Sequence, residues 1–110
     1  MIDWTRVAEL RAEVGADAFD EVADMFLSEI GEAAARLTDP GAGTPAGALH
    51  YLKGAALNLG FEEVSAACER AEAAIAGGAD PDRSVAEVLA RLDASRTAFV
   101  EGRAAGRHAA

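Results

Sequence analysis

The chain has 110 residues and a formal net charge of −9, because 19 aspartates and glutamates outnumber 10 lysines and arginines. Nucleic acids and anionic membranes attract clustered basic residues, so this balance argues against both as partners. The single cysteine, Cys68, cannot form an internal disulfide or a cysteine-based zinc site, and no signal peptide or long apolar run is visible, so we expect a soluble cytoplasmic protein.

The composition favours helices, because 28 residues are alanine, the strongest helix former, and only three are proline. In chain order, a first helix is predicted from an N-cap at Asp3 to Val14, with Gly15 as its C-cap. A second helix begins near Asp17 and carries an apolar residue every three or four positions up to Leu37. That spacing is typical of one buried helical stripe.

Three more helices are predicted after a loop over residues 38–43. The third spans 45–59, with a threonine cap and a proline at its start and Gly60 at its end. The fourth follows at once and stops at a pair of glycines, after which an aspartate and Pro81 open the fifth. Each boundary therefore carries residue types that are typical of a helix end.

Helices of this length joined by short loops predict an all-α fold, an antiparallel up-and-down four-helix bundle. The short N-terminal helix is expected to lie across one end of the bundle. Residues 1–101 would form this single domain. Residues 102–110 would form a frayed or disordered tail, because they carry little that could pack, and His108 in that tail is given no role.

His50 lies in the third predicted helix and is expected to face solvent. The buried face of that helix is formed by four apolar residues, Leu49, Leu52, Ala56 and Leu59. At about 100° per residue, His50 points roughly 140° away from the centre of that face. Gly54 lies one turn further on and Gly47 almost one turn back, so the positions that flank the imidazole have no side chains. Glycines on the face away from the core favour an interaction surface over a packing role.

Two further residues extend this exposed patch. Lys53, three residues after His50, places a cation beside the imidazole, and Leu57, two turns along, is apolar where a solvated residue is expected. The segment from Gly47 to Gly60 contains no acidic residue, so we expect a locally non-acidic surface on an acidic protein. A partner could approach the histidine closely there.

The segment HYLKGAALNLG, residues 50–60, resembles the signature His-x-x-Lys-Gly-x-x-x-x-(aliphatic)-Gly of histidine-containing phosphotransfer (HPt) domains. The resemblance extends across about the first hundred residues. It includes a Phe-Leu pair at residues 26–27 in the second helix and the stretch from Cys68 to Glu72 after the signature. The family resemblance implies a helical bundle that carries phosphoryl groups in two-component signalling.

By this resemblance, His50 would be the phosphoacceptor, attacking through Nε2 an aspartyl phosphate on a receiver domain and later returning the phosphoryl group to an aspartate on another receiver. Lys53 would stabilise the phosphoryl charge. Partner docking would fall to four residues around the histidine: Gly47, Tyr51, Gly54 and Leu57. Tyr51 departs from the family pattern, which more often has a small or polar residue there, and this departure bears on partner choice.

The resemblance also implies that the receiver supplies Mg²⁺, so neither a cofactor nor a metal site is expected in this chain. We expect a monomeric carrier without kinase or phosphatase activity of its own, with response-regulator receivers and a hybrid histidine kinase as partners. No Gly-rich phosphate loop is visible, which argues against a histidine kinase. The remaining alternative is a helical adaptor that keeps the HPt framework without transferring phosphoryl groups, and the presence of both His50 and Lys53 argues against it.

Overall fold

The computed structural model describes residues 1–109, which form five α-helices and two short 3-10 helices and contain no strand. The α-helices are α1 Trp4–Val14, α2 Phe19–Leu37, α3 Ala46–Asn58, α4 Glu62–Ala76 and α5 Pro81–Ala104. The 3-10 helices are η1 Pro40–Ala42 and η2 Arg107–Ala109. The predicted all-α fold class is confirmed.

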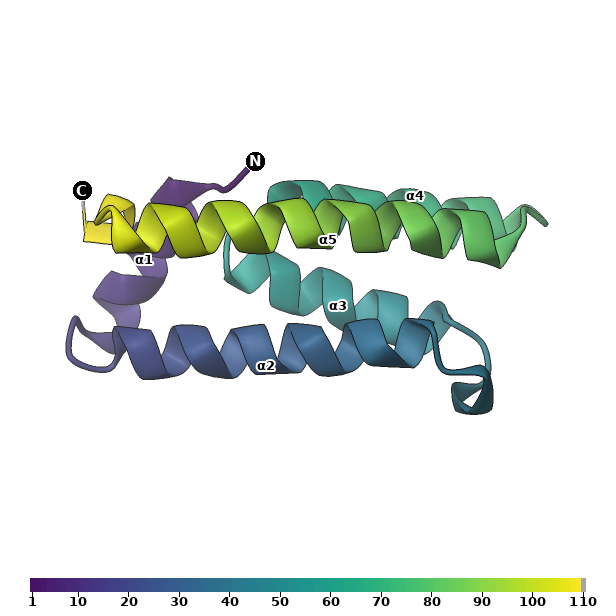
Figure 1. Cartoon of the computed structure of the whole chain (residues 1–110), viewed down its shortest axis with the longest axis horizontal. Coiled ribbons are helices and arrows are strands. Elements are labelled where there is room, and N and C mark those ends of the chain that lie inside the picture. The colour runs from purple at the N-terminus through teal and green to yellow at the C-terminus, as the bar shows by residue number, and fades with distance from the viewer. Residues whose placement is uncertain (110) are drawn as a thin grey trace.

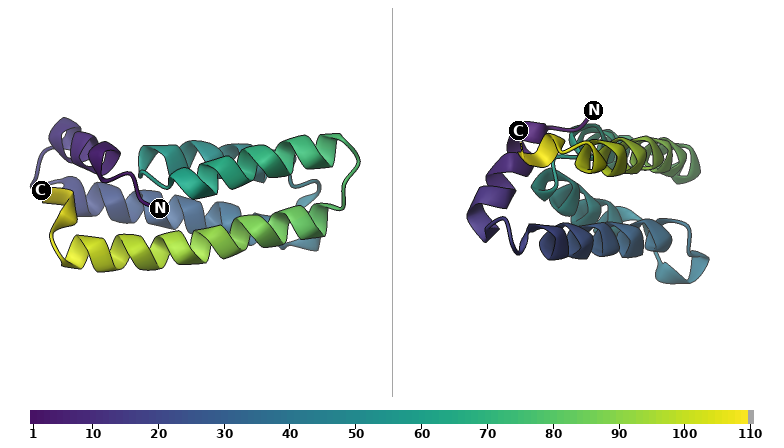
Figure 2. Two further views of the ribbon diagram at one scale, coloured as in Figure 1. Left: turned by 90° about the horizontal axis from the view of Figure 1, so that it is seen from above. Right: turned by 60° about the vertical axis from the view of Figure 1, so that its left-hand side comes forward.

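Helices α2 to α5 run antiparallel to their neighbours along the long axis of a molecule that measures 44 × 23 × 20 Å (Figure 1). Helix α3 packs against both α2 and α4, and α4 packs against α5. Helix α1 lies across one end of this bundle, as both further views show (Figure 2). The predicted up-and-down bundle with a crossing N-terminal helix is therefore confirmed.

Most helix ends lie within about two residues of the predicted boundaries. The Asp3 carboxylate accepts a hydrogen bond from the backbone N–H of Arg6 at 3.1 Å, which caps α1. The Asp80 carboxylate accepts one from the backbone N–H of Asp82 at 3.0 Å, which caps α5. At the start of α3, Pro45 occupies the capping position and no side chain caps the helix, so the predicted threonine cap is wrong.

The core of the bundle fixes the rotation of α3. The largest fully buried side chains come from all parts of the described chain: Val7, Phe19, Ile30, Leu49, Leu52, Leu59, Phe61, Val64, Cys68, Val88, Leu92 and Phe99. Buried alanines fill the space between them, which lets the helices approach closely. The four residues predicted as the buried face of α3 are all fully buried. Since that face points to the core, the opposite face of α3 points to solvent.

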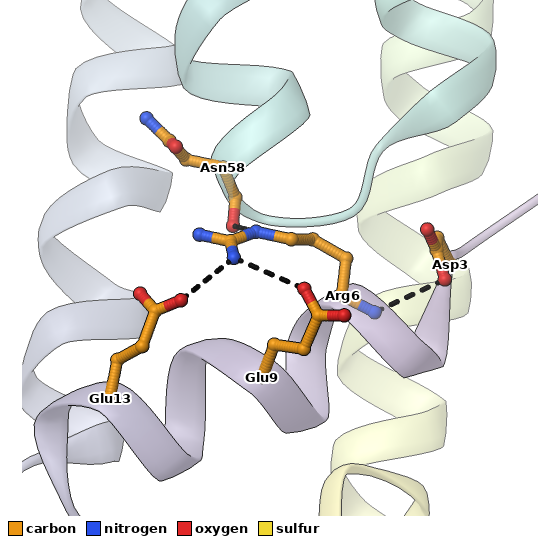
Figure 3. A network of polar contacts seen from close by, with 5 residues as sticks. All are labelled: Asp3, Arg6, Glu9, Glu13 and Asn58. Carbon is orange, nitrogen blue, oxygen red and sulfur yellow. Dashed lines mark hydrogen bonds and ion pairs between the residues drawn. The ribbon is translucent and has the colours of Figure 1, made fainter.

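Arg6 ties α1 to the C-terminal end of α3 (Figure 3). Its Nε donates a hydrogen bond to the backbone carbonyl oxygen of Asn58 at 3.3 Å. Its Nη1 pairs with the carboxylates of Glu9 at 3.4 Å and Glu13 at 3.1 Å. Carbonyls in the last turn of a helix lack a partner within the helix, so Arg6 satisfies one of them while it holds the crossing helix in place.

Gly60 ends the third helix in a conformation that requires glycine. Its φ is +78°, and a Cβ there would lie 2.7 Å from the backbone carbonyl oxygen of Asp3 and 3.1 Å from the Val7 side chain. The backbone N–H of Asp3 donates to the carbonyl of Gly60 at 2.8 Å. The last glycine of the 50–60 segment therefore serves the fold, because it lets α1 dock against the end of α3.

Residues 102–109 differ from the predicted frayed tail. Helix α5 continues through the expected domain boundary at residue 101 as far as Ala104. Gly102 is buried so closely against the Trp4 indole that a Cβ would collide with it. The prediction also covered Ala110, which lies outside the described residues.

The segment after α5 packs because α1 and the first residue of α2 offer it aromatic surfaces. The His108 ring stacks on Phe19 with centroids 5.1 Å apart, and the Arg107 guanidinium lies 5.3 Å from the centroid of the Trp4 ring. Helix η2 accordingly contacts α1. The composition of the tail gave no sign of this packing, since its partners lie about a hundred residues earlier in the sequence.

Candidate functional site

His50 lies in the second turn of α3 and is exposed, as predicted. Its position follows from the buried face of α3, which points the opposite side of the helix to solvent. Within residues 1–109 its imidazole makes no hydrogen bond to another group of the chain. Both ring nitrogens are therefore free to meet a partner.

A groove of about 310 Å³ lies on one flank of His50, between α3 and α2. It is lined by Phe26 and Glu29 from α2 and by His50, Tyr51, Gly54, Ala55 and Asn58 from α3. Tyr51 is 46% exposed and lies on this α2 flank, whereas Lys53 turns toward α4. The structure thus brings together three of the predicted site residues in one depression: His50, Tyr51 and Gly54.

The two helix glycines beside His50 have no packing role. A Cβ at Gly47 or at Gly54 would meet nothing within 4 Å. Glycine inside a helix costs about 1 kcal/mol relative to alanine, so the chain is less stable for having them. Leu57 is 53% exposed on the same helix, two turns beyond His50, which agrees with its predicted place on the surface. The two glycines therefore leave the approach to the imidazole open.

Lys53 differs from the predicted exposed cation. Its side chain is only 22% exposed, and its Nζ lies 3.6 Å from the Oε2 of Glu72 on α4. The expectation of a non-acidic surface is also wrong, because Glu29 lines the groove on the α2 flank and Glu72 stands on the α4 flank. The error arose because both carboxylates come from neighbouring helices, which spacing within α3 cannot show.

Sequence reasoning did not place Phe26 and Glu29 at this site, although a signal existed for them. The two residues are three apart on α2, so they share a helix face. Their shared face is therefore one with which α2 could line a groove against α3. Glu72 carried no such signal, since its pairing depends on the rotation of α4 relative to α3.

Cys68 and His108 are less accessible than His50. Burial above all, and the charge of Glu72 to a smaller extent, raise the pKa of the Cys68 thiol to about 12, although Lys53 acts in the opposite direction. A thiol with this pKa stays protonated near neutral pH and is unreactive. His108 stacks on Phe19 at the end of the bundle where α1 crosses. His50 is therefore the histidine that stands open on the bundle's side.

No three or more His, Cys, Asp or Glu side chains among residues 1–109 are grouped so that they could hold a metal ion. In that same part of the chain, no helix combines the length and the apolar character needed to cross a bilayer.

The described chain is an antiparallel helical bundle that carries an exposed histidine on α3, with open space beside it. The sequence model of the Hpt domain matches residues 21–98, which is more than half of the chain, so the chain belongs to the Hpt domain family. This family acts in histidine phosphotransfer within phosphorelays. Searches of curated proteins and of solved structures found no match.

Proposed function

We propose that this chain is a phosphorelay intermediate that accepts a phosphoryl group on His50 from a receiver-domain aspartate and passes it to an aspartate of another receiver. The observation that carries the proposal is the exposed, unbonded imidazole of His50 on α3, inside the region that matches the Hpt family. The glycines beside it leave space for a second protein.

The chemistry requires little from this chain beyond a presented imidazole. Neutral imidazole is a competent nucleophile near pH 7, and the donor is already an activated acyl phosphate. The Nε2–P bond forms as the O–P bond of the aspartyl phosphate breaks, the aspartate leaves as a carboxylate, and Nδ1 keeps its proton. The same step in reverse passes the phosphoryl group on. The receiver would supply the Mg²⁺, so positioning and charge neutralisation are the remaining needs.

The surface around His50 suits transient docking of a receiver. Tyr51 and Leu57 are large, exposed and apolar on the docking face, and the groove beside Gly54 can admit a partner side chain. Glu29 adds a carboxylate that favours a basic group on the partner. Lys53 is the cation nearest in sequence to His50, and it pairs with Glu72 on the α4 flank. The site is formed within one chain, so we propose that the protein acts as a monomer.

The test is phosphoryl exchange with purified receiver domains. The protein is mixed with each phosphorylated receiver of its source organism in the presence of Mg²⁺, and acid-labile label on the protein is followed over time. We expect label to appear with at least one receiver, to move on to a second unlabelled receiver, and not to appear with ATP alone. Receiver binding without any label would instead establish the alternative, a helical adaptor that does not transfer phosphoryl groups.

A further inference from the structure

The α4 flank of His50 holds an ion pair that is not explained by docking. The Nζ of Lys53 lies 3.6 Å from Oε2 of Glu72, and the two side chains are 22% and 31% exposed. Lys53 is three residues after His50, so the two are neighbours on the surface of α3. Glu72 also lines a depression of about 210 Å³ with Ala46 and Leu49, and Ala46 precedes His50 by four residues. The carboxylate therefore lies alongside the helical turn that carries the histidine.

The negative charge of Glu72 is compensated by Lys53. Its second oxygen, Oε1, is buried and has no hydrogen-bond partner in the part of the chain that the structure describes. Over residues 1–109, Lys53 makes no ion pair other than the one with Glu72. Both groups are partly withdrawn from water, so salt screens their interaction less than that of a fully exposed pair. The positive charge beside His50 is thus offset before any phosphoryl group arrives.

We propose that Glu72 is a positioning residue that sets, through Lys53, how strongly phosphorylated His50 holds its phosphoryl group. This inference rests on the proposed function of His50. A phosphoryl group on Nε2 brings up to about two negative charges next to the pair. Lys53 alone would stabilise that group, whereas the carboxylate of Glu72 competes for the ammonium and repels the phosphoryl oxygens. The phosphohistidine then remains a good donor, which a carrier needs because it must release what it accepts.

The substitution Glu72→Gln removes the charge but keeps the shape of the side chain. The variant and the wild type are equilibrated with a fixed ratio of phosphoramidate to ammonia, so that the N–P bond of phosphoramidate breaks, the Nε2–P bond forms and ammonia leaves. The ratio of phosphorylated to free His50 is read by ³¹P NMR, and the spectrum of His50→Gln identifies any signal from His108. We expect Glu72→Gln to raise this ratio about threefold to tenfold at low salt, and less at 0.5 M salt.

Glu69→Gln is the matched control. Glu69 lies three residues earlier on α4, is exposed, and makes no ion pair among residues 1–109. Glu69→Gln changes the net charge of the protein by the same amount as Glu72→Gln. The ratio of phosphorylated to free His50 in this variant should therefore stay within about twofold of the wild type. Equal ratios for the two glutamine variants would overturn the inference.

A second pair of variants separates charge from structure. Lys53→Met should lower the ratio about threefold to tenfold, because Glu72 then faces the phosphoryl group alone. The double variant Lys53→Met/Glu72→Gln restores a neutral pair and should return the ratio close to the wild-type value. A double variant as low as Lys53→Met would refute the role of Glu72, and circular dichroism confirms that each variant is folded. This readout needs no receiver, so a failure of receiver exchange would refute the proposed function separately.

Discussion

His50→Gln is expected to lower phosphoryl uptake from a phosphorylated receiver by on the order of a thousandfold or more, because it removes the attacking nitrogen. Neither the cysteine nor the second histidine is placed to substitute for it. Cys68 is buried with a raised pKa, and His108 is stacked on Phe19 at the end of the bundle. The imidazole makes no hydrogen bond within residues 1–109, so the stability of the variant should change by no more than about 0.5 kcal/mol.

The measurement is the initial rate of acid-labile labelling, with thermal unfolding of both proteins as the check on folding. His108→Gln is the matched control, since it removes the other histidine of the chain and leaves α3 intact. We expect His108→Gln to take label at the wild-type rate. Labelling of His50→Gln at that rate would show that the site lies elsewhere.

Gly54→Leu is expected to slow transfer from a receiver about a hundredfold without harming the fold. Gly54 lines the groove beside His50, and a Cβ there meets nothing within 4 Å, so the chain itself accepts a side chain at this position. A receiver must bring its phosphorus to about 3–3.5 Å from Nε2, and a displacement of about 1 Å can cost a hundredfold in rate. A leucine in the groove would produce such a displacement.

Small donors separate this steric effect from any damage to His50. Phosphoramidate is far smaller than a receiver, so its reaction with His50 should change by less than about threefold in Gly54→Leu. Gly54→Ala should raise the free energy of unfolding by about 1 kcal/mol and slow receiver transfer much less than leucine does. Receiver transfer by Gly54→Leu at the wild-type rate would contradict the docking surface proposed around the histidine.

The exposure of His50 could be predicted from the sequence because it depends on local geometry alone. Once Leu49, Leu52 and Leu59 are recognised as one buried stripe, the fixed rotation per residue places His50 on the opposite side. Helix ends could be predicted for a similar reason. Caps such as Asp3 and Asp80 satisfy backbone groups within a few residues of themselves.

The features that escaped prediction all depend on how one helix is turned against another. The pairing of Lys53 with Glu72 requires α4 to present that carboxylate toward α3, and no spacing rule within either helix fixes this rotation. The position of Glu29 beside His50 likewise depends on α2. Residues 102–109 were misjudged because the buried Gly102 packs against Trp4, at the other end of the sequence.

These contacts also change what the net charge means for the site. The net charge of −9 argues against nucleic acid as a partner, and Glu29 and Glu72 bring part of that charge to the two flanks of His50. A phosphoryl group would therefore arrive beside an offset lysine and between two carboxylates. Under the proposal made for Glu72, such surroundings would favour passing the group on over storing it.

The most direct test of the central claim is the identity of the phosphorylated atom after transfer from a receiver. Phosphorus-coupled ¹H–¹⁵N NMR spectra of the ¹⁵N-labelled protein would report which histidine nitrogen is bonded to phosphorus. We expect one phosphohistidine, bonded at Nε2 of His50, with the ring signals of His108 unchanged. Phosphorus on His108, or on no histidine while the protein carries label, would contradict the account.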